Sequence, residues 1–367
     1  MIDLATHNKK TYKMNNFQLS TCNSQLKNRL FPITVLFLAC LFSTCKKDFS
    51  VNAPYEDFPI VMGLMNPADN THYVKIYKSF VTENSAYDAA KDIHLYSYID
   101  SIEVYMEERD EKNKLIRKIP FDTTTEIAKD AGIFAFPTQI LYKTEAELNI
   151  NYHYTLYAYN PYTKKMAHSS SIVLAGQVNI VSPSGTTLSI AEIPFSFKYV
   201  PTTNACMYEF AVTFYYSEMM KDRSTRQGEP IVWTLGQQSH QSSGILASPE
   251  AGGRFFFQRI AASIAADENV VSRHTDSIVL SVFTAETDWY LYLYANRPSS
   301  GINQNRLDYT NISAYDTESK EKKYALGIFS SRAVTSRMFR DLSLITGARD
   351  SLFYGRFTGH LKFTDNY

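Results

Sequence analysis

The feature that most constrains the fold of this chain is the alternation of apolar and polar residues in short segments. In the segment 100–108, Ile102, Val104 and Met106 occupy every second position. Successive side chains of a β-strand point to opposite faces, so this period of two is typical of a strand with one buried face. Comparable segments recur along the chain and are separated by turn residues, as at 66–70. We therefore expect an all-β protein.

The spacing of these segments predicts two β-rich domains. Across 58–175, about seven short strands separated by turns are typical of an immunoglobulin-like β-sandwich. A second β-rich domain is expected over 176–367, because the 26 Tyr and 23 Phe of the chain favour half-buried strands over helices. Only the stretch 255–266 breaks the pattern, since its apolar residues recur at helical spacing. It predicts one short helix in the C-terminal domain.

The segment 28–50 has the composition of a secretory signal. Basic residues precede an apolar run over 30–42, and two small residues follow that run before Cys45. A basic start, an apolar core and small residues at the cleavage point are the parts of a signal peptide. The run of about a dozen apolar residues is too short to span a bilayer, which takes roughly 20. We expect residues 1–44 to be a lipoprotein signal peptide and residues 45–57 to be a tether.

A cysteine directly after the cleavage point resembles the bacterial lipobox, in which that cysteine carries two acyl chains and begins the mature protein. Two acyl chains hold a protein stably on a membrane, whereas one does not. Cys45 is the first choice for the lipid anchor, because the Lys-Lys-Asp after it is similar to the sorting signal of Bacteroidota lipoproteins. Cys40 is the second choice: Ala39 fits the lipobox better, but two large apolar residues would then begin the mature chain. The alternative is an ordinary cleaved signal with incidental cysteines.

The charge and the cysteine count exclude several classes of protein. The whole chain has 37 basic and 37 acidic residues, and its first 44 residues hold five of the bases and one of the acids. The rest has 32 bases and 36 acids, a net charge of −4, which argues against a binder of nucleic acid or a polybasic membrane-surface binder. Beyond Cys45 only Cys206 remains, so no intramolecular disulfide is available. Cys206 is predicted to be a buried core thiol.

No catalytic or metal-binding pattern is visible in the sequence. The eight histidines are scattered without a pair at metal-ligand spacing, and no nucleophile elbow, Walker loop or dinucleotide fingerprint occurs. The carboxylate pairs at 107–108 and 267–268 point to opposite strand faces and are expected to be solvated charges. We predict no catalytic residue, no metal and no cofactor, and we do not expect an enzyme. A hydrolase whose acids meet only in the fold is the remote alternative.

One segment, Trp289-Tyr-Leu-Tyr-Leu-Tyr, is rich in aromatic residues. We predict a strand over 289–294, and on such a strand Tyr290, Tyr292 and Tyr294 share one face. A tyrosine ladder open to solvent can stack against a sugar or a partner's surface, because tyrosine has an apolar body and a polar tip. The alternative is a strand covered on both faces, with its hydroxyls bonded locally.

Four passages resemble a known family. They are His72-Tyr-Val-Lys-Ile-Tyr-Lys-Ser-Phe, Gly132-Ile-Phe with Gln139-Ile-Leu-Tyr, Phe255-Phe-Phe-Gln-Arg-Ile leading to Arg273, and Tyr309-Thr-Asn-Ile with Ala325-Leu-Gly-Ile-Phe-Ser-Ser-Arg. Over nearly its whole mature length the chain resembles a family of Bacteroidota cell-envelope lipoproteins known only as a domain of unknown function. The resemblance implies an immunoglobulin-like sandwich, a second β-rich part and no known catalytic residue. The charged loop 313–324 departs from the family, whose last two passages nearly adjoin.

The anchor, the resemblance and the lack of a catalytic motif lead to one expectation. The protein is expected in the outer membrane, held by the lipid on Cys45, on either the cell surface or the periplasmic face. The resemblance implies an accessory or binding subunit of an envelope assembly such as a TonB-dependent transporter. A surface adhesin or glycan-binding protein that uses exposed aromatic residues is the alternative. Nucleic acid is not expected as a partner.

Overall fold

The structure, a computed structural model, describes residues 55–83, 85–99, 101–297, 309–344 and 347–365. Strands account for 45% and helices for 12%, so the all-β prediction is confirmed. The predicted signal peptide and both candidate anchor residues, Cys40 and Cys45, lie outside the described residues. None of the described helices is long and apolar enough to cross a bilayer.

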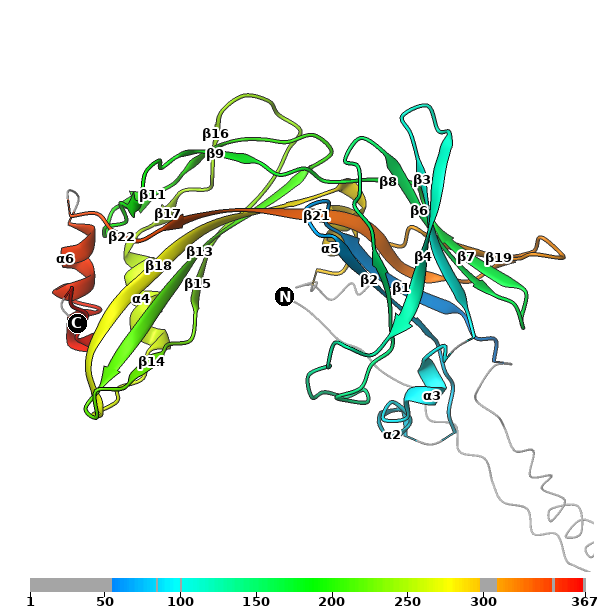
Figure 1. The fold of residues 1–367 in the computed structure, drawn as a ribbon, viewed down its shortest axis with the longest axis horizontal. Helices are drawn as coiled ribbons and strands as arrows, with labels where there is room; N and C mark the ends of the chain where they lie inside the picture. Colours follow the sequence, from blue (N-terminus) through cyan, green and yellow to red (C-terminus); the bar gives the residue numbers. More distant parts are fainter. Residues whose placement is uncertain (1–54, 84, 100, 298–308, 345–346, 366–367) are drawn as a thin grey trace, which may run out of the picture. The chain divides into compact units, whose positions relative to one another are not determined.

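The first part of the chain folds as a two-sheet sandwich (Figure 1). Its strands are β1 (Pro59–Met65), β2 (Thr71–Lys78), β3 (Glu103–Arg109), β4 (Leu115–Thr124), β5 (Leu141–Glu145), β6 (His153–Asn160), β7 (Lys165–Ser169) and β8 (Ile172–Val173), extended past β7 by β19 (Ile312–Asp316) and β20 (Lys322–Lys323). One sheet has the order β1-β2-β5 and the other β4-β3-β6-β7, and β4 pairs with both β3 and β5. This strand order is that of an immunoglobulin-like sandwich, as the sequence predicts.

A tyrosine at the start of β6 fixes the turn that leads into this strand. The hydroxyl of Tyr154 accepts a hydrogen bond at 2.7 Å from the backbone N–H of Asn149, five residues upstream. Such a tyrosine corner at the start of the sixth strand is a hallmark of immunoglobulin-like sandwiches. The predicted alternation in β3 is also confirmed, since Val104 and Met106 are buried in the sandwich core and Ile102 packs against it.

One long strand is shared by both parts of the chain. β21 (Leu326–Phe339), orange in Figure 1, pairs in parallel with β1 through its first six residues and antiparallel with β18 (Val270–Ala285) through its last eight. Ile312, Ala314 and Phe329 pack in the sandwich core. The sequence placed these residues in the C-terminal domain. The structure differs from this prediction because the pairing of a strand with a partner far along the chain produces no pattern in the local sequence.

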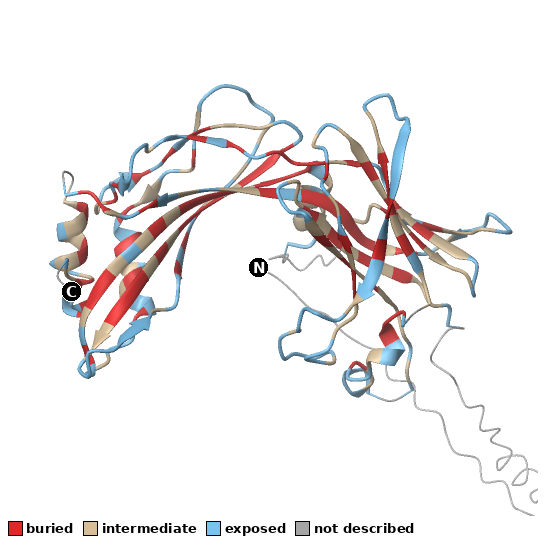
Figure 2. Cartoon of the chain, viewed as in Figure 1, coloured by how far each residue is buried: buried red, intermediate tan, exposed pale blue. Residues whose placement is uncertain are grey.

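The second part is built on a sheet of long strands with its own core. Besides β18 and β21 its strands are β9 (Asn179–Ser182), β10 (Thr187–Leu188), β11 (Pro194–Phe195), β12 (Lys198–Val200), β13 (Met207–Met220), β14 (Thr225–Gln227), β15 (Ile231–Ser239), β16 (Leu246–Ala247), β17 (Ala251–Gly252) and β22 (Asp341–Leu342). The main order is β14-β13-β18-β21, and β15 also pairs with β13. Buried residues recur along β13 and β18 (red in Figure 2).

The predicted helix is confirmed as α4 (Arg254–Ser263). Its Phe256, Phe257 and Ile260 are buried in the second core. The ring of Phe256 meets that of Phe214 edge-on, with 5.8 Å between the ring centroids. The helical spacing of apolar residues therefore marked the face of α4 that packs against the sheet.

Further short helices interrupt the strands. They are α2 (Ala86–Ala89), α3 (Ile93–Tyr96), α5 (Thr287–Ala295), α6 (Ala348–Phe353) and the 3₁₀ helix η1 (Gly359–Leu361). α2 and α3 lie between β2 and β3, and α5 directly follows β18. The strand predicted over 289–294 is wrong, because these residues belong to α5.

Candidate functional site

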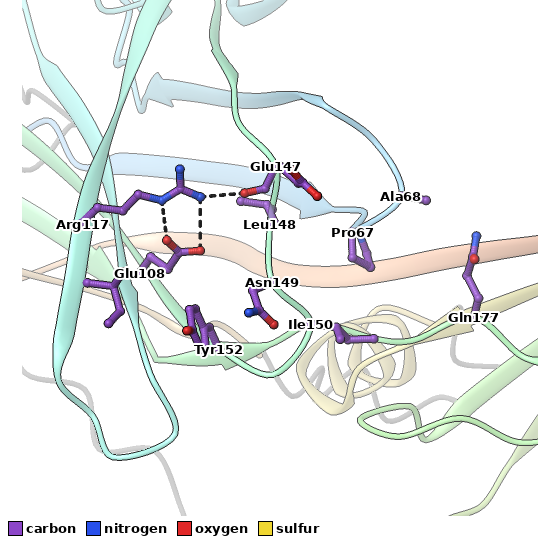
Figure 3. A pocket seen from close by; sticks show the side chains of 11 residues that line it. Pro67, Ala68, Glu108, Arg117, Glu147, Leu148, Asn149, Ile150, Tyr152 and Gln177 are labelled. Atoms are coloured by element: carbon purple, nitrogen blue, oxygen red, sulfur yellow. Dashed lines mark hydrogen bonds and ion pairs between the residues drawn. The ribbon is translucent and has the colours of Figure 1, made fainter.

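An open pocket of about 740 Å³ lies at one end of the sandwich (Figure 3). The β1–β2 and β5–β6 connections supply most of its walls, and the adjoining ends of β3 and β4 supply the rest except for Gln177. These parts meet because every second connection between antiparallel strands returns to the same end. Its lining includes Pro67, Ile116, Arg117, Asn149, Tyr152 and Gln177. We call it the Arg117 pocket.

The polar wall of the Arg117 pocket is an ion pair between a buried carboxylate and an exposed guanidinium. Nε and Nη2 of Arg117 both donate to the carboxylate of Glu108, which is 3% exposed, and Nη2 also donates to the backbone carbonyl of Glu147 at 2.6 Å. The hydroxyl of Tyr154 donates to Oε1 of Glu108 at 2.7 Å. Burial, with this bond to the carboxylate, raises the pKa of Tyr154 well above its ordinary value. Glu108 thus holds Arg117 in place, because its oxygens accept hydrogen bonds from Arg117 and Tyr154.

The open part of the pocket suits a polar, extended ligand. Within the described part of the chain, Nη1 of Arg117 has no hydrogen-bond partner, and in Figure 3 this nitrogen points away from Glu108. The side-chain amides of Asn149 and Gln177 add polar groups, and Ile116 adds an apolar one. A guanidinium matches a carboxylate or a carbonyl. The pocket can therefore bind a carboxylate or carbonyl flanked by apolar groups, as in a peptide segment.

The structure corrects the expectation for the carboxylates at 107–108. Both side chains are buried, and they are not solvated charges. Glu107 pairs with Arg109 at 2.6 Å on the opposite face from Glu108. In the β3–β4 register Glu108 lies opposite Arg117, and Glu107 opposite Lys118. An acidic pair facing a basic pair across a hairpin is a stabilising cross-strand pattern, and it is the sequence signal that could have revealed this site.

Tyr290, Tyr292 and Tyr294 do not form the predicted ladder. On α5 the rings of Tyr290 and Tyr294 lie 6.2 Å apart, one turn along the helix, while Tyr292 stacks on Trp289 at 5.6 Å. Of the three tyrosines, only Tyr294 is exposed. An alternating apolar and aromatic run fits a strand or a helix. The side chain of Glu286 favours the helix by accepting a hydrogen bond from a backbone N–H of its first turn.

A polar network anchors the start of α5. Glu286, 8% exposed, accepts a hydrogen bond from Oγ of Ser330 at 2.7 Å. Asp288 accepts from Nδ2 of Asn311 at 2.6 Å and from Oγ of Ser170 at 3.0 Å. Burial raises the pKa of the Glu286 carboxyl. The donors come from β21 and from segments of the sandwich, so this network fastens the start of α5 to both.

The described residues show no other arrangement that points to chemistry. No group of three or more His, Cys, Asp or Glu side chains in that part of the chain could hold a metal ion. Cys206 is buried as predicted, and burial raises the pKa of its thiol. Nε2 of His72 lies 3.0 Å from the backbone carbonyl oxygen of Ala146, and burial lowers the pKa of this histidine. These side chains therefore have packing roles.

Comparison with known proteins leaves the identity of the chain open. No protein-family model matches the sequence, and no curated protein is recognisably similar to it. One similar solved structure is the C-terminal globular domain of an oligosaccharyltransferase from Pyrococcus abyssi (10% identity, TM-score 0.24, covering 60% of this chain and 42% of that one). Another is native Escherichia coli alpha-2-macroglobulin (8%, TM-score 0.18, covering 77% and 14%). Each match spans less than half of that chain, and neither bears on function. The resemblance to the lipoprotein family stays an expectation.

Proposed function

We propose that the protein is a non-enzymatic outer-membrane lipoprotein, anchored through Cys45. In this proposal it serves as an accessory or binding subunit of an envelope assembly such as a TonB-dependent transporter. The observation that carries the proposal is the segment 28–50, where a basic start, a short apolar core and Cys45-Lys-Lys-Asp follow one another. Two acyl chains on Cys45 would keep the folded part beside partners in the same membrane.

The Arg117 pocket supports a binding role. It is open, and its lining includes Arg117 and the side-chain amides of Asn149 and Gln177. A pre-formed concave site with a few placed polar groups is the usual form of a binding site. A segment of a partner protein that carries a carboxylate or exposed carbonyls would satisfy these groups.

The buried carboxylates support a non-catalytic role. Glu108 and Glu218 are held in ion pairs with arginines, and Glu286 is held by hydrogen bonds. General acid–base catalysis needs a carboxyl group within hydrogen-bond reach of a substrate. These three groups are instead occupied by neighbours in the fold.

Replacing Cys45 by alanine is expected to abolish acyl labelling and to release the protein from the membrane fraction. The reason is that the two acyl chains would be the main hold on the bilayer. Metabolic labelling with a fatty-acid analogue, followed by membrane fractionation, measures both effects. Cys40→Ala is the matched control and should keep both properties. Labelling that is lost only in Cys40→Ala would show that the anchor assignment is wrong.

Purification of the lipidated protein from native membranes in mild detergent tests the binding role. We expect a stoichiometric outer-membrane barrel to co-purify. Ile116→Asp, which places a charge in the Arg117 pocket, should reduce its recovery by about tenfold or more. Leu115→Asp is the control, because this neighbour is similarly exposed and does not line the pocket. Recovery of the protein alone would count against the transporter role, and equal loss in both variants would count against the pocket.

A further inference from the structure

Two loops expose a cluster of large apolar side chains at the end of the sandwich opposite the Arg117 pocket. The β2–β3 loop and the β4–β5 loop each expose four such side chains, and three from each loop are considered together, leaving aside Ile99 and Ile127. These six are Val81, Tyr87 and Leu95 in the first loop and Ile133, Phe134 and Phe136 in the second, with exposed fractions from 39% to 69%. We call these six residues the apolar loop face. Exposed apolar clusters of this kind mark sites of interaction with a partner or a membrane.

The two loops are joined to each other, so the apolar loop face is preformed. The backbone N–H of Ala135 donates to the carbonyl of Ala90 at 3.0 Å. The ring of Phe134 packs edge-on against the buried ring of Tyr96, with 5.1 Å between centroids. In Figure 1 the helices α2 and α3 lie next to the β4–β5 loop. Little conformational entropy would be lost when this face meets a surface.

The chain enters the sandwich at the end that carries the apolar loop face. The hydroxyl of Tyr55 donates to the carbonyl of Ser79, and the N–H of Ser79 donates to the carbonyl of Phe58 at 3.0 Å. The residues before β1 therefore lie beside the start of the β2–β3 loop. β1 then runs to the opposite end, where the β1–β2 turn lines the Arg117 pocket.

The distance along the chain from Cys45 limits where this end of the sandwich can lie. Tyr55 is ten residues after Cys45, and ten residues span at most about 35 Å when fully extended. If Cys45 carries the lipid, Tyr55, which lies beside the start of the β2–β3 loop, stays within that reach of the bilayer. A weak second contact near the anchor can add to membrane binding, because the anchor already holds the contacting residues at a high local concentration beside the membrane.

The charge of the two loops indicates which membrane surface they suit. Residues 79–102 and 125–140 contain six acids against two bases, namely Glu83, Asp88, Asp92, Asp100, Glu126 and Asp130 against Lys91 and Lys129. A net charge of −4 opposes contact with anionic lipid headgroups. Apolar and aromatic side chains enter the interfacial region of a bilayer without needing that attraction. The face therefore suits a zwitterionic lipid surface.

We propose that the apolar loop face is a membrane-contact surface, which inserts into the interfacial region of the bilayer that holds the anchor. This inference rests on the proposed lipid anchor at Cys45. The insertion orients the sandwich, so that the Arg117 pocket at its opposite end faces away from the lipid. A lipid on a single residue does not by itself fix that orientation.

The fragment 55–367 tests this surface without the anchor. It forms one compact unit with two cores of its own and lacks Cys45. We expect it to co-sediment with vesicles of phosphatidylcholine and phosphatidylethanolamine. The triple variant Tyr87→Ser, Ile133→Ser and Phe136→Ser should reduce its partition coefficient by about tenfold or more, because three exposed apolar groups are lost. Adding phosphatidylglycerol should not strengthen the binding, since the loops are acidic.

The matched control is Ile193→Ser, Ile245→Ser and Tyr354→Ser, which removes three similarly exposed apolar side chains from the second part of the chain. This variant should bind vesicles like the parent fragment. Absence of co-sedimentation, or an equal loss in both triple variants, would overturn the proposal and leave a protein partner as the occupant of the face. In the full-length protein the loop variant should still be acylated and membrane-bound, so failure of the face and failure of the anchor are distinguishable.

Discussion

Replacing Arg273 by leucine is expected to lower the free energy of unfolding by about 3–5 kcal/mol. Arg273 is 3% exposed, and its Nε donates at 2.9 Å to Glu218, which is 5% exposed. Its Nη1 donates to the carbonyl of Leu361 at 2.8 Å, and its Nη2 to that of Ala265 at 3.4 Å. The guanidinium therefore links β18 to β13, to the residues after α4 and to the C-terminal segment. Its loss removes the donor to Oε1 of the buried Glu218 carboxylate, which keeps only the half-exposed Arg226 as a partner, and it removes a donor from each of two carbonyls.

The shift of the urea midpoint of fragment 55–367 measures this effect. Arg226→Leu is the matched control, because Arg226 binds the same carboxylate at 2.6 Å but has a side chain that is 50% exposed. We expect it to cost about 1 kcal/mol or less. The double variant Arg273→Leu with Glu218→Leu should be more stable than Arg273→Leu alone, because the buried carboxylate is then removed together with its buried partner. Equal effects of the two arginine variants would contradict this account.

Replacing Gly327 by alanine is expected to destabilise the protein by about 3 kcal/mol or more. Gly327 lies on β21 opposite Val61 of β1, with a φ of +116°. A Cβ added there would lie 1.9 Å from the carbonyl oxygen of Val61. β1 and β21 would have to separate or the backbone of β21 would have to change. The variant therefore weakens the pairing between β1 and β21, through which β21 joins the sandwich.

A second glycine separates backbone strain from steric overlap. Gly244 also has a positive φ, +88°, but a Cβ added there would meet nothing within 4 Å. We expect Gly244→Ala to cost about 1 kcal/mol, the penalty of the left-handed region alone. Chemical denaturation of both variants gives the comparison. A Gly327→Ala protein no less stable than Gly244→Ala would show that the β1–β21 contact can relax.

Local sequence patterns were sufficient for many of the elements. The alternation through Val104 and Met106 predicted β3 and its buried face, and the spacing of Phe256 and Ile260 predicted α4. Both predictions succeeded because the period of an element is set by its own backbone geometry, and only one face of it is buried. The helix α5 shows where local patterns are not sufficient. Its alternating apolar and aromatic residues fit either a strand or a helix, and the cap by Glu286 favours the helix.

The candidate site was much less accessible from the sequence. The acids at 107–108 were expected to be solvated, whereas Glu108 is held in the core by Arg117 and Tyr154. Arg117 comes from the next strand and Tyr154 from the strand after the β5–β6 turn. Without knowing which strands pair, the sequence does not show that Arg117 and Tyr154 are the partners of Glu108. Many other basic residues and tyrosines could equally bind this carboxylate.

By itself the sequence determined the all-β class, the position of one helix and the alternation that buries one face of each strand, because these depend on neighbours along the chain. It also contains the lipoprotein-like segment on which the proposed anchor depends. Only the tertiary structure decided that β21 contributes to both cores, and that the Arg117 pocket and the apolar loop face lie at opposite ends of the sandwich. Those features depend on contacts between residues far apart in the chain, whose energies exceed local preferences.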